Sequence, residues 1–352
     1  MEKSKRILEL DIARSFAIVF VVLCHSLESI YSLKIDNMEN LPMMIKIFVF
    51  TVFTIGRMGV PLFLFISGYL LLGKTYNSEI CLQFWKKNMF NLLLTTEIWI
   101  VFYHIFMLCV YNQPFSKTEF LLNIMMIKNV NMPHMWYMPM IIGVYLFVPL
   151  LSNLLNLFDD RIWKIILTVI FVYSFGGTTL GILYKIKTGN TLNVVTPMFI
   201  CNYYGLYLIL GYMVKKSVFD LIKSKYIVFA GTVSLMLAVF IQICSYSRAV
   251  EYKVWYNDPF LLVSSFMLFI MINRLHFKFL NEKIFLQISK YAFGIYLTHN
   301  CVMILIRKYI QIKGSLPLQT LQLWSITFLI SYVIVAICNR SKYIRRYFFL
   351  IK

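Results

Sequence analysis

Arg14 and His25 are the residues of this sequence whose types and spacing most directly suggest chemistry. They stand eleven residues apart in an apolar segment. Eleven residues make close to three helical turns, so both side chains lie on one face, about 16 Å apart along the axis. An imidazole titrates near neutral pH and takes a proton from a hydroxyl group, and a guanidinium binds phosphates. We therefore expect one polar stripe that joins the two sides of a membrane.

Each of these two residues also has a purely structural explanation. An arginine at the centre of a membrane helix costs about 2.5–3.5 kcal/mol, but one that lies a turn or two from the end can snorkel to the interface. A lone histidine commonly forms a hydrogen bond with a serine or a backbone carbonyl of a neighbouring helix. The presence of both residues on one face favours a functional explanation.

Further charged residues lie in and beside the second and third apolar segments. Arg57 stands among small residues and precedes Pro61, which frees a backbone carbonyl. Arg57 is either a bidentate anion binder or one half of an ion pair with Glu97, the one acidic residue well inside the third segment. Lys86 and Lys87 stand at the cytoplasmic mouth of that segment. They either follow the ordinary positive-inside distribution or help to bind phosphates.

Two more histidines lie in the later segments. His134 directly precedes Met135 and Trp136 at the outer start of the fourth segment, where aromatic residues are typical of a membrane interface. His134 is either an exposed interface residue or a wall of an outward-facing site. His299 is buried in the ninth segment, where a hydrogen bond that packs helices together is at least as good an explanation as catalysis.

Motifs of several other enzyme classes are absent from the sequence. It contains no G-x-S-x-G, no Walker loop and no H-E-x-x-H. The seven cysteines are scattered, and no spacing of Cys and His suggests a metal site or a disulfide framework. We expect no bound metal or cofactor. Polarity and spacing alone therefore predict group transfer, or transport, along a polar pathway.

Membrane helices are the elements that must position these residues. The 352-residue sequence is 60% hydrophobic and 14% charged, against about 25% charged residues in soluble domains. Its apolar runs are continuous and long enough to cross a bilayer as helices, and they lack the alternation of barrel strands. We expect an all-α, polytopic membrane protein with one domain over residues 1–352. The predicted spans, about ten, are 8–30, 44–72, 88–111, 135–152, 162–183, 196–214, 226–246, 257–273, 291–312 and 317–339.

The second predicted span is overlong, so we expect it to be tilted, bent or composed of two packed pieces. The distribution of Lys and Arg predicts the orientation of all the spans. Loops on the side of the N-terminus carry about twice as many of these residues as the opposite loops, which favours two cytoplasmic termini. Arg14 then lies toward the cytoplasm and His25 toward the outside.

The formal net charge of +19 also fits a membrane protein, because Lys and Arg gather in the short loops between the spans. No basic run has the interleaved aromatic residues of a nucleic-acid groove, so we expect no nucleic-acid partner. The first apolar run carries Arg14 and lacks a cleavage site, so we expect a membrane span there and not a cleaved signal peptide.

Five segments, in order along the chain, resemble the sequence blocks of acyltransferase family 3, the integral-membrane O-acyltransferases. The resemblance covers essentially the whole chain, which makes five individually weak motifs a strong signal. One departure is Ser15 followed by Phe16, where the family commonly has a small and an aliphatic residue. The similar segments are LDIAR at 10–14 with His25 after ten further residues, RMGVPLFLFISGYLL at 57–71, FWKK at 84–87, HMWYMP at 134–139 with PL at 149–150, and YLTH at 296–299.

The resemblance implies a multi-pass O-acyltransferase of the inner cell membrane. Such an enzyme moves an acyl group, usually acetyl, from cytoplasmic acyl-CoA to a hydroxyl of a surface polysaccharide or its lipid-linked precursor. Acyl-CoA is then a co-substrate, and the glycan and the bilayer are the partners. The implied roles are catalysis for His25; donor binding for Arg14, Arg57, Lys86 and Lys87; and an acceptor-side or supporting role for Glu97, His134, Trp136 and His299.

Two other functions stay open on the sequence. One is a transporter or exporter of a glycolipid or anionic solute, although no inverted repeat is evident. The other is a scaffold in a glycan-assembly complex whose polar residues only pack helices. Fused family members carry a hydrolase-like domain after the last span. Since this sequence shows none, we expect the chain to complete the transfer itself or to pass acyl groups to a partner.

Overall fold

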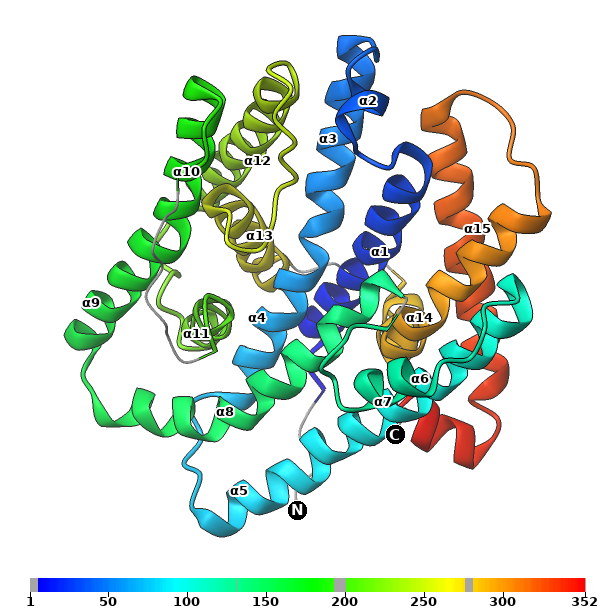
Figure 1. The fold of residues 1–352 in the computed structure, drawn as a ribbon. Coiled ribbons are helices and arrows are strands. Elements are labelled where there is room, and N and C mark those ends of the chain that lie inside the picture. Colours follow the sequence, from blue (N-terminus) through cyan, green and yellow to red (C-terminus); the bar gives the residue numbers. More distant parts are fainter. Residues whose placement is uncertain (1–5, 131, 193–200, 276–280, 352) are drawn as a thin grey trace.

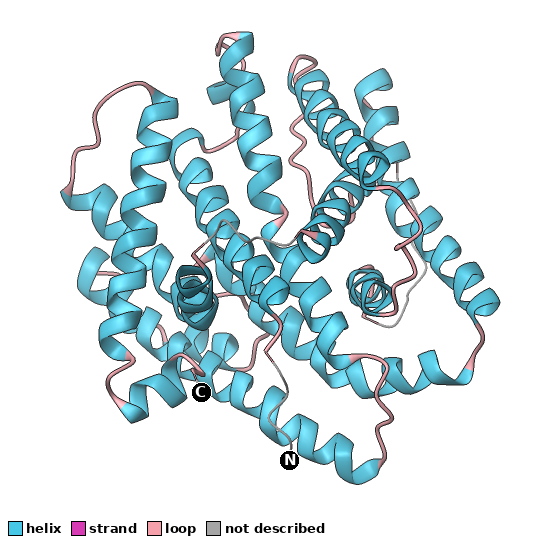
Figure 2. Ribbon diagram, turned by 180° about the vertical axis from the view of Figure 1, so that it is seen from behind, coloured by secondary structure: helices cyan, strands magenta, loops and turns pink. Residues whose placement is uncertain are grey.

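The computed structural model describes residues 6–130, 132–192, 201–275 and 281–351, and these residues form helices and no strand (Figure 2). The predicted all-α class is therefore confirmed. Seven helical segments of the described chain are long and apolar enough to cross a membrane, which supports a multi-pass membrane protein. The number of ten spans and the cytoplasmic location of the termini stay predictions. In Figure 1, α1 (Leu8–Tyr31) begins and η4 (Ile344–Phe348) ends toward the same, lower side of the molecule.

The other helices lie between these two in the sequence. In chain order they are α2 (Ile35–Met38), α3 (Met43–Arg57), α4 (Gly59–Leu71), α5 (Ser78–Phe84), η1 (Trp85–Met89), α6 (Phe90–Tyr111), α7 (Lys117–Ile124), η2 (Pro133–Trp136), α8 (Tyr137–Leu157), α9 (Asp160–Ile170), η3 (Phe171–Gly176), α10 (Gly177–Thr188), α11 (Tyr204–Lys215), α12 (Ser224–Tyr246), α13 (Pro259–Arg274), α14 (Glu282–Tyr309) and α15 (Leu316–Cys338).

Helix α1 is the central element of the bundle. It packs against α3, α4, α13, α14 and α15, and it passes between them in Figure 1. Of its most apolar window, 67% is buried inside the protein, against 17% for the window over α9 and α10. An apolar helix that is buried on most sides has protein and not lipid as its surroundings. The residues of α1 can therefore line an internal site.

The second predicted span is bent, as expected, at Met58. Helix α3 ends at Arg57 and α4 begins at Gly59, so two helices share one apolar run. Pro61 has no backbone N–H to donate to the carbonyl of Arg57, which explains a helix break at this point. The bend lies beside α1. A Cβ atom built on Gly56 would lie only 2.7 Å from the Cβ atom of Cys24 on α1.

Other boundaries differ from the predicted spans. The ninth span was expected from residue 291, but α14 begins at Glu282, because its first turns carry charged residues that hydropathy alone excludes. The third span continues back through η1 into α5, and the fifth contains the π-helical turn η3. The predicted span at 196–214 lies partly outside the described residues, and α11 begins at Tyr204.

Helices α4 and α11 cross at backbone contact. A Cβ atom built on Gly68 would lie 1.9 Å from the carbonyl oxygen of Leu208, and one built on Gly211 would lie 2.1 Å from that of Phe65. Each glycine therefore faces the backbone of the opposite helix, which cannot move aside as a flexible side chain can. Small residues at such crossings let membrane helices approach closely.

We predict that Gly68→Ala lowers the stability of the protein by about 1–3 kcal/mol or more, because an added methyl group overpacks this crossing. The melting temperature in detergent should fall by several degrees. Gly143→Ala in α8 is the matched control, since a Cβ atom there meets nothing within 4 Å. Equal melting temperatures for the two variants would contradict the close crossing.

Candidate active site

His25 is the first member of a row of polar side chains on the C-terminal half of α1. Its Nδ1 atom lies 3.2 Å from Oε2 of Glu28, one helical turn further along the same helix. The other carboxylate oxygen, Oε1, accepts a hydrogen bond of 2.9 Å from Nη2 of Arg57. Nη1 of Arg57 lies 3.3 Å from the hydroxyl of Tyr256. The row links α1, the end of α3 and the loop before α13.

The contact with Glu28 places a carboxylate oxygen beside Nδ1 of His25. A carboxylate beside Nδ1 favours the imidazole tautomer that carries its proton on Nδ1. Nε2 then keeps an unshared electron pair, which is the requirement for a general base. The His25 side chain is 16% exposed and lines a small cavity, so the protein does not enclose it completely.

Arg57 is enclosed by aromatic rings as well as paired with Glu28. Its guanidinium carbon lies 4.8 Å from the ring centre of Phe53 and 4.7 Å from that of Trp255, at cation–π distance. Its side chain is only 6% exposed. The Nε atom is buried and has no hydrogen-bond partner among the described residues.

The alternative of an ion pair between Arg57 and Glu97 is wrong. Because α3 packs against α1, Arg57 is brought to Glu28. Glu97 lies on α6, which packs against α8 and η4. Its Oε2 atom is buried without a hydrogen-bond partner in the described part of the chain. The role of Glu97 as a supporting residue stays a prediction.

Three histidines from distant parts of the chain meet beside this row. The rings of His25 and His299 are stacked with centres 5.3 Å apart, and the ring of His134 lies 4.9 Å from His299 and 6.4 Å from His25. They come from α1, α14 and η2. The structure therefore brings together His25, His134 and His299.

Hydrogen bonds distinguish His134 from the other two. The hydroxyl of Tyr103 donates to the carbonyl of Leu297 at 2.6 Å, so its oxygen accepts from Nε2 of His134 at 3.1 Å. Nδ1 of His134 then accepts from the amide of Asn300. Both ring nitrogens are satisfied and the residue is 1% exposed, so the alternative of an exposed interface residue is wrong. His134 is a fixed wall of the site.

His299 has one satisfied nitrogen and one free nitrogen. Its Nδ1 atom donates to the carbonyl of Tyr296 at 2.6 Å, within its own helix. Its Nε2 atom is buried and has no hydrogen-bond partner among the described residues. Such an unsatisfied polar atom is uncommon in a protein interior.

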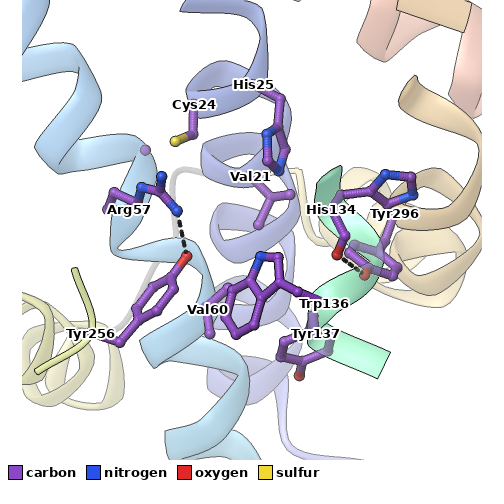
Figure 3. A pocket seen from close by; sticks show the side chains of 11 residues that line it. Val21, Cys24, His25, Arg57, Val60, His134, Trp136, Tyr137, Tyr256 and Tyr296 are labelled. Atoms are coloured by element: carbon purple, nitrogen blue, oxygen red, sulfur yellow. Dashed lines mark hydrogen bonds between the residues drawn. The ribbon is translucent and has the colours of Figure 1, made fainter. Parts of the chain in front are cut away.

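A small cavity adjoins these groups, and Figure 3 shows the side chains around it. His25, Arg57, His134 and Trp136 line it, together with several tyrosines and apolar residues. Its volume is about 20 Å³, which is room for about one water molecule. The ring of Trp136 stacks against Tyr256 with centres 5.2 Å apart, so Trp136 is part of the cavity wall.

Arg14 lies at the other end of α1, where it joins α1 to α14. Its Nη1 atom lies 3.3 Å from Asp11 and donates to the hydroxyl of Ser289 at 3.0 Å. Asp11 also pairs with Arg6, at 2.6 Å, so two guanidinium groups share one carboxylate. The cluster carries net positive charge, and the Arg14 side chain is 31% exposed. These properties suit an anion-binding group.

The face of α1 between Arg14 and His25, which the sequence leaves open as a channel or as packed helix, is packed helix. Ile18, Val21 and Val22 lie between them on α1 and are at most 5% exposed. Their apolar side chains pack against neighbouring helices, which separates the two polar ends of the helix.

Lys86 and Lys87 are exposed on the π-helical turn η1. Their ammonium groups form no hydrogen bond or ion pair with the rest of the described chain. The structure does not bring them into contact with Arg14, and their role in donor binding stays a prediction.

Comparison with known protein families identifies the chain. The family model described as an acyltransferase domain matches residues 7–340, nearly the whole sequence. The chain belongs to acyltransferase family 3. The resemblance drawn from the five sequence blocks is therefore confirmed. No curated protein and no solved structure matches the chain significantly.

Several residues of this acyltransferase site were missed by the sequence analysis. Glu28 could have been predicted as a neighbour of His25, because it stands three residues later and so faces the same side of the helix. Tyr256 and Trp255 lie in a loop almost two hundred residues from Arg57, and no local pattern marks them. Asn300 follows His299 directly, but its contact with His134 depends on how α14 and η2 pack.

We predict strong energetic coupling between Glu28 and Arg57 in a double-mutant cycle. Glu28→Gln should destabilise the acyltransferase by about 3–5 kcal/mol, because it leaves the buried guanidinium without its counter-charge. The double variant with Arg57→Gln should lose less stability than the sum of the single variants. Denaturant or thermal unfolding in detergent measures these differences. The control is Glu97→Gln with Arg57→Gln, whose effects should add; coupling there instead would mean that the pairing is misassigned.

Proposed function

We propose that this acyltransferase moves an acyl group, acetyl first of all, from cytoplasmic acyl-CoA to a hydroxyl of a surface polysaccharide or its lipid-linked precursor. The enzyme would reside in the inner cell membrane. The observation that carries the proposal is the contact of Nδ1 of His25 with Glu28, which leaves Nε2 without a hydrogen-bond partner among the described residues. His25 lines a small cavity in a member of an acyltransferase family.

The proposed reaction is a direct acyl transfer. Nε2 of His25 takes the proton of the acceptor hydroxyl as the hydroxyl oxygen attacks the thioester carbonyl. The carbon–sulfur bond then breaks, and the coenzyme A sulfur leaves with the proton held by His25. Glu28 stabilises the transient imidazolium, as the carboxylate does in other base–carboxylate pairs.

Arg57 would contact the donor at its acyl carbonyl in this proposal. Its unpartnered Nε–H group belongs to a residue that lines the cavity, and a buried donor of this kind stabilises an oxyanion in low dielectric surroundings. The pair with Glu28 already compensates its charge, which argues against a role in binding the phosphates. Donor phosphates fit Arg14 better, with Lys86 and Lys87 as more distant charges.

The cavity must open when substrates bind. A volume of about 20 Å³ holds about one water molecule, so it has no room for an acyl group of any length beside His25. The pantetheine arm of coenzyme A joins the thioester to the phosphates, so it would follow α1 over the distance of about 16 Å from Arg14 to His25. Since Ile18 and Val21 are packed along that path, side chains must move aside when the donor binds.

We predict that His25→Ala lowers acyl transfer by about 10²- to 10⁴-fold, the usual contribution of a general base. The variant should keep the melting temperature of the wild type. Two measurements test this: release of coenzyme A from acetyl-CoA, and mass spectrometry of surface glycans from cells with and without the gene. Transfer at the wild-type rate by His25→Ala would remove His25 from the mechanism. Glycans that keep the same acetylation after deletion would reject this acceptor.

We predict that Arg14→Gln raises the KM for acetyl-CoA about tenfold and leaves kcat nearly unchanged, because it removes a charge-assisted contact with phosphate. Arg307→Gln is the matched control. Arg307 also joins α14 to α1 through a serine, by a bond of 2.8 Å to Ser29, but at the opposite end of α1. If both variants change KM equally, Arg14 only holds helices together.

A further inference from the structure

A second cavity lies between α6 and α7, in the connection between the third and fourth predicted spans. Its volume is about 290 Å³, far larger than that of the cavity beside His25. Drug-sized ligands occupy sites of roughly 300–1,000 Å³, so this one suits a single ring with some water. With the predicted orientation, it faces the outer side of the membrane.

Side chains that can both donate and accept hydrogen bonds shape this cavity. Nε2 of His104 donates to the carbonyl oxygen of Asn123 at 2.9 Å, which leaves Nδ1 of the imidazole as an acceptor. The amide nitrogen of Asn123 donates to the backbone carbonyl of Lys128 at 2.8 Å, so the loop after α7 is tied to α6. Asn129 also lines the cavity. Such groups match the hydroxyls of a sugar.

The charges in the cavity wall compensate one another. The ammonium group of Lys128 pairs with the carboxylate of Glu119. This bond lowers the pKa of Glu119, so the pair stays ionised at neutral pH. A ligand in the cavity therefore meets one positive and one negative group in contact with each other, which favours an uncharged ligand over a phosphate or a carboxylate.

An aromatic ring supplies the apolar face that a sugar ring needs. Phe115 lines the cavity and is 55% exposed. Its ring centre lies 6.2 Å from that of His104 and 5.5 Å from that of Phe120, which holds the ring in place. Polar groups around an exposed, fixed aromatic ring suit a pyranose and do not suit an acyl chain.

One residue separates this cavity from the site beside His25. Tyr103 lines the cavity, and its hydroxyl lies 3.1 Å from Nε2 of His134. The ring centres of Tyr103 and His134 are 5.6 Å apart, and those of His134 and His25 are 6.4 Å apart. A glycan chain that presents one sugar to His25 can thus place a neighbouring sugar in this cavity.

We propose that the cavity between α6 and α7 binds a neutral sugar ring of the acceptor, next to the ring that receives the acyl group. The assignment rests on the proposed function for its place in the reaction, but the binding itself is a property of the cavity. Phe115 supplies the stacking face, and His104 and Asn129 bind hydroxyl groups.

The test is saturation-transfer NMR on the full chain in phosphatidylcholine nanodiscs, without sugar-based detergent. The probes are the methyl glycosides of glucose and N-acetylglucosamine, compared with glucuronate and inorganic phosphate. We expect the neutral glycosides to bind. Phe115→Ala should lower the affinity for them about tenfold, which is the contribution of one aromatic contact. Thr118→Ala, in the first turn of α7 three residues after Phe115 and outside the cavity lining, should bind these glycosides as the wild type does.

A change of charge sharpens the test. Glu119→Gln leaves Lys128 unpaired and should raise the affinity for glucuronate, whereas Glu119→Gln combined with Lys128→Met should remove this gain. Absence of binding by both neutral glycosides overturns the proposal. So does tighter binding of phosphate or glucuronate to the wild type, or equal binding by wild type and Phe115→Ala.

These measurements are made without acyl-CoA and can be repeated on His25→Ala. If the acyl-transfer proposal fails, sugar binding still reports on the cavity. If transfer to a glycan is observed and the glycosides do not bind, only the sugar site is rejected.

Discussion

The carboxylate of Glu28 is the interaction on which the rest of the site depends. It compensates the buried charge of Arg57 and, through its other oxygen, orients the imidazole of His25. An uncompensated guanidinium at this depth would be strongly unfavourable. One acidic side chain therefore contacts both α3 and His25. The bend at Met58 and the glycine contact at Gly56 are the backbone features that bring the three residues together.

Three histidines in one cluster have three different roles because their hydrogen bonds differ. His134 uses both nitrogens within the protein and is rigid. His299 uses one nitrogen within its own helix and leaves the other unsatisfied. Of the three, only His25 has a carboxylate partner, and its side chain is partly exposed. The residue type is therefore the same in all three positions, but the contacts of the ring nitrogens differ.

The sequence predicts most of this fold, because long apolar runs have one stable form in a bilayer. The sequence also singles out Arg14 and His25 as candidate site residues. Polar side chains in a membrane helix are energetically costly, and the spacing of these two within one helix can be seen from the sequence alone. The partner of Arg57 was not predictable, since Glu28 and Glu97 were both within reach and only the packing of α3 against α1 decides between them. The aromatic cage from the loop before α13 and the contact of Asn300 with His134 depend on tertiary packing in the same way.

The apolar segment of α1 between Arg14 and His25 has a consequence for the cell. A continuous polar pathway through the bundle would let protons and ions cross the membrane whenever the enzyme stood idle. Ile18, Val21 and Val22 close that route with packed hydrocarbon, which carries no charge across. An acyltransferase with this packed segment can then remain in the membrane between turnovers without opening a path for ions through its own bundle.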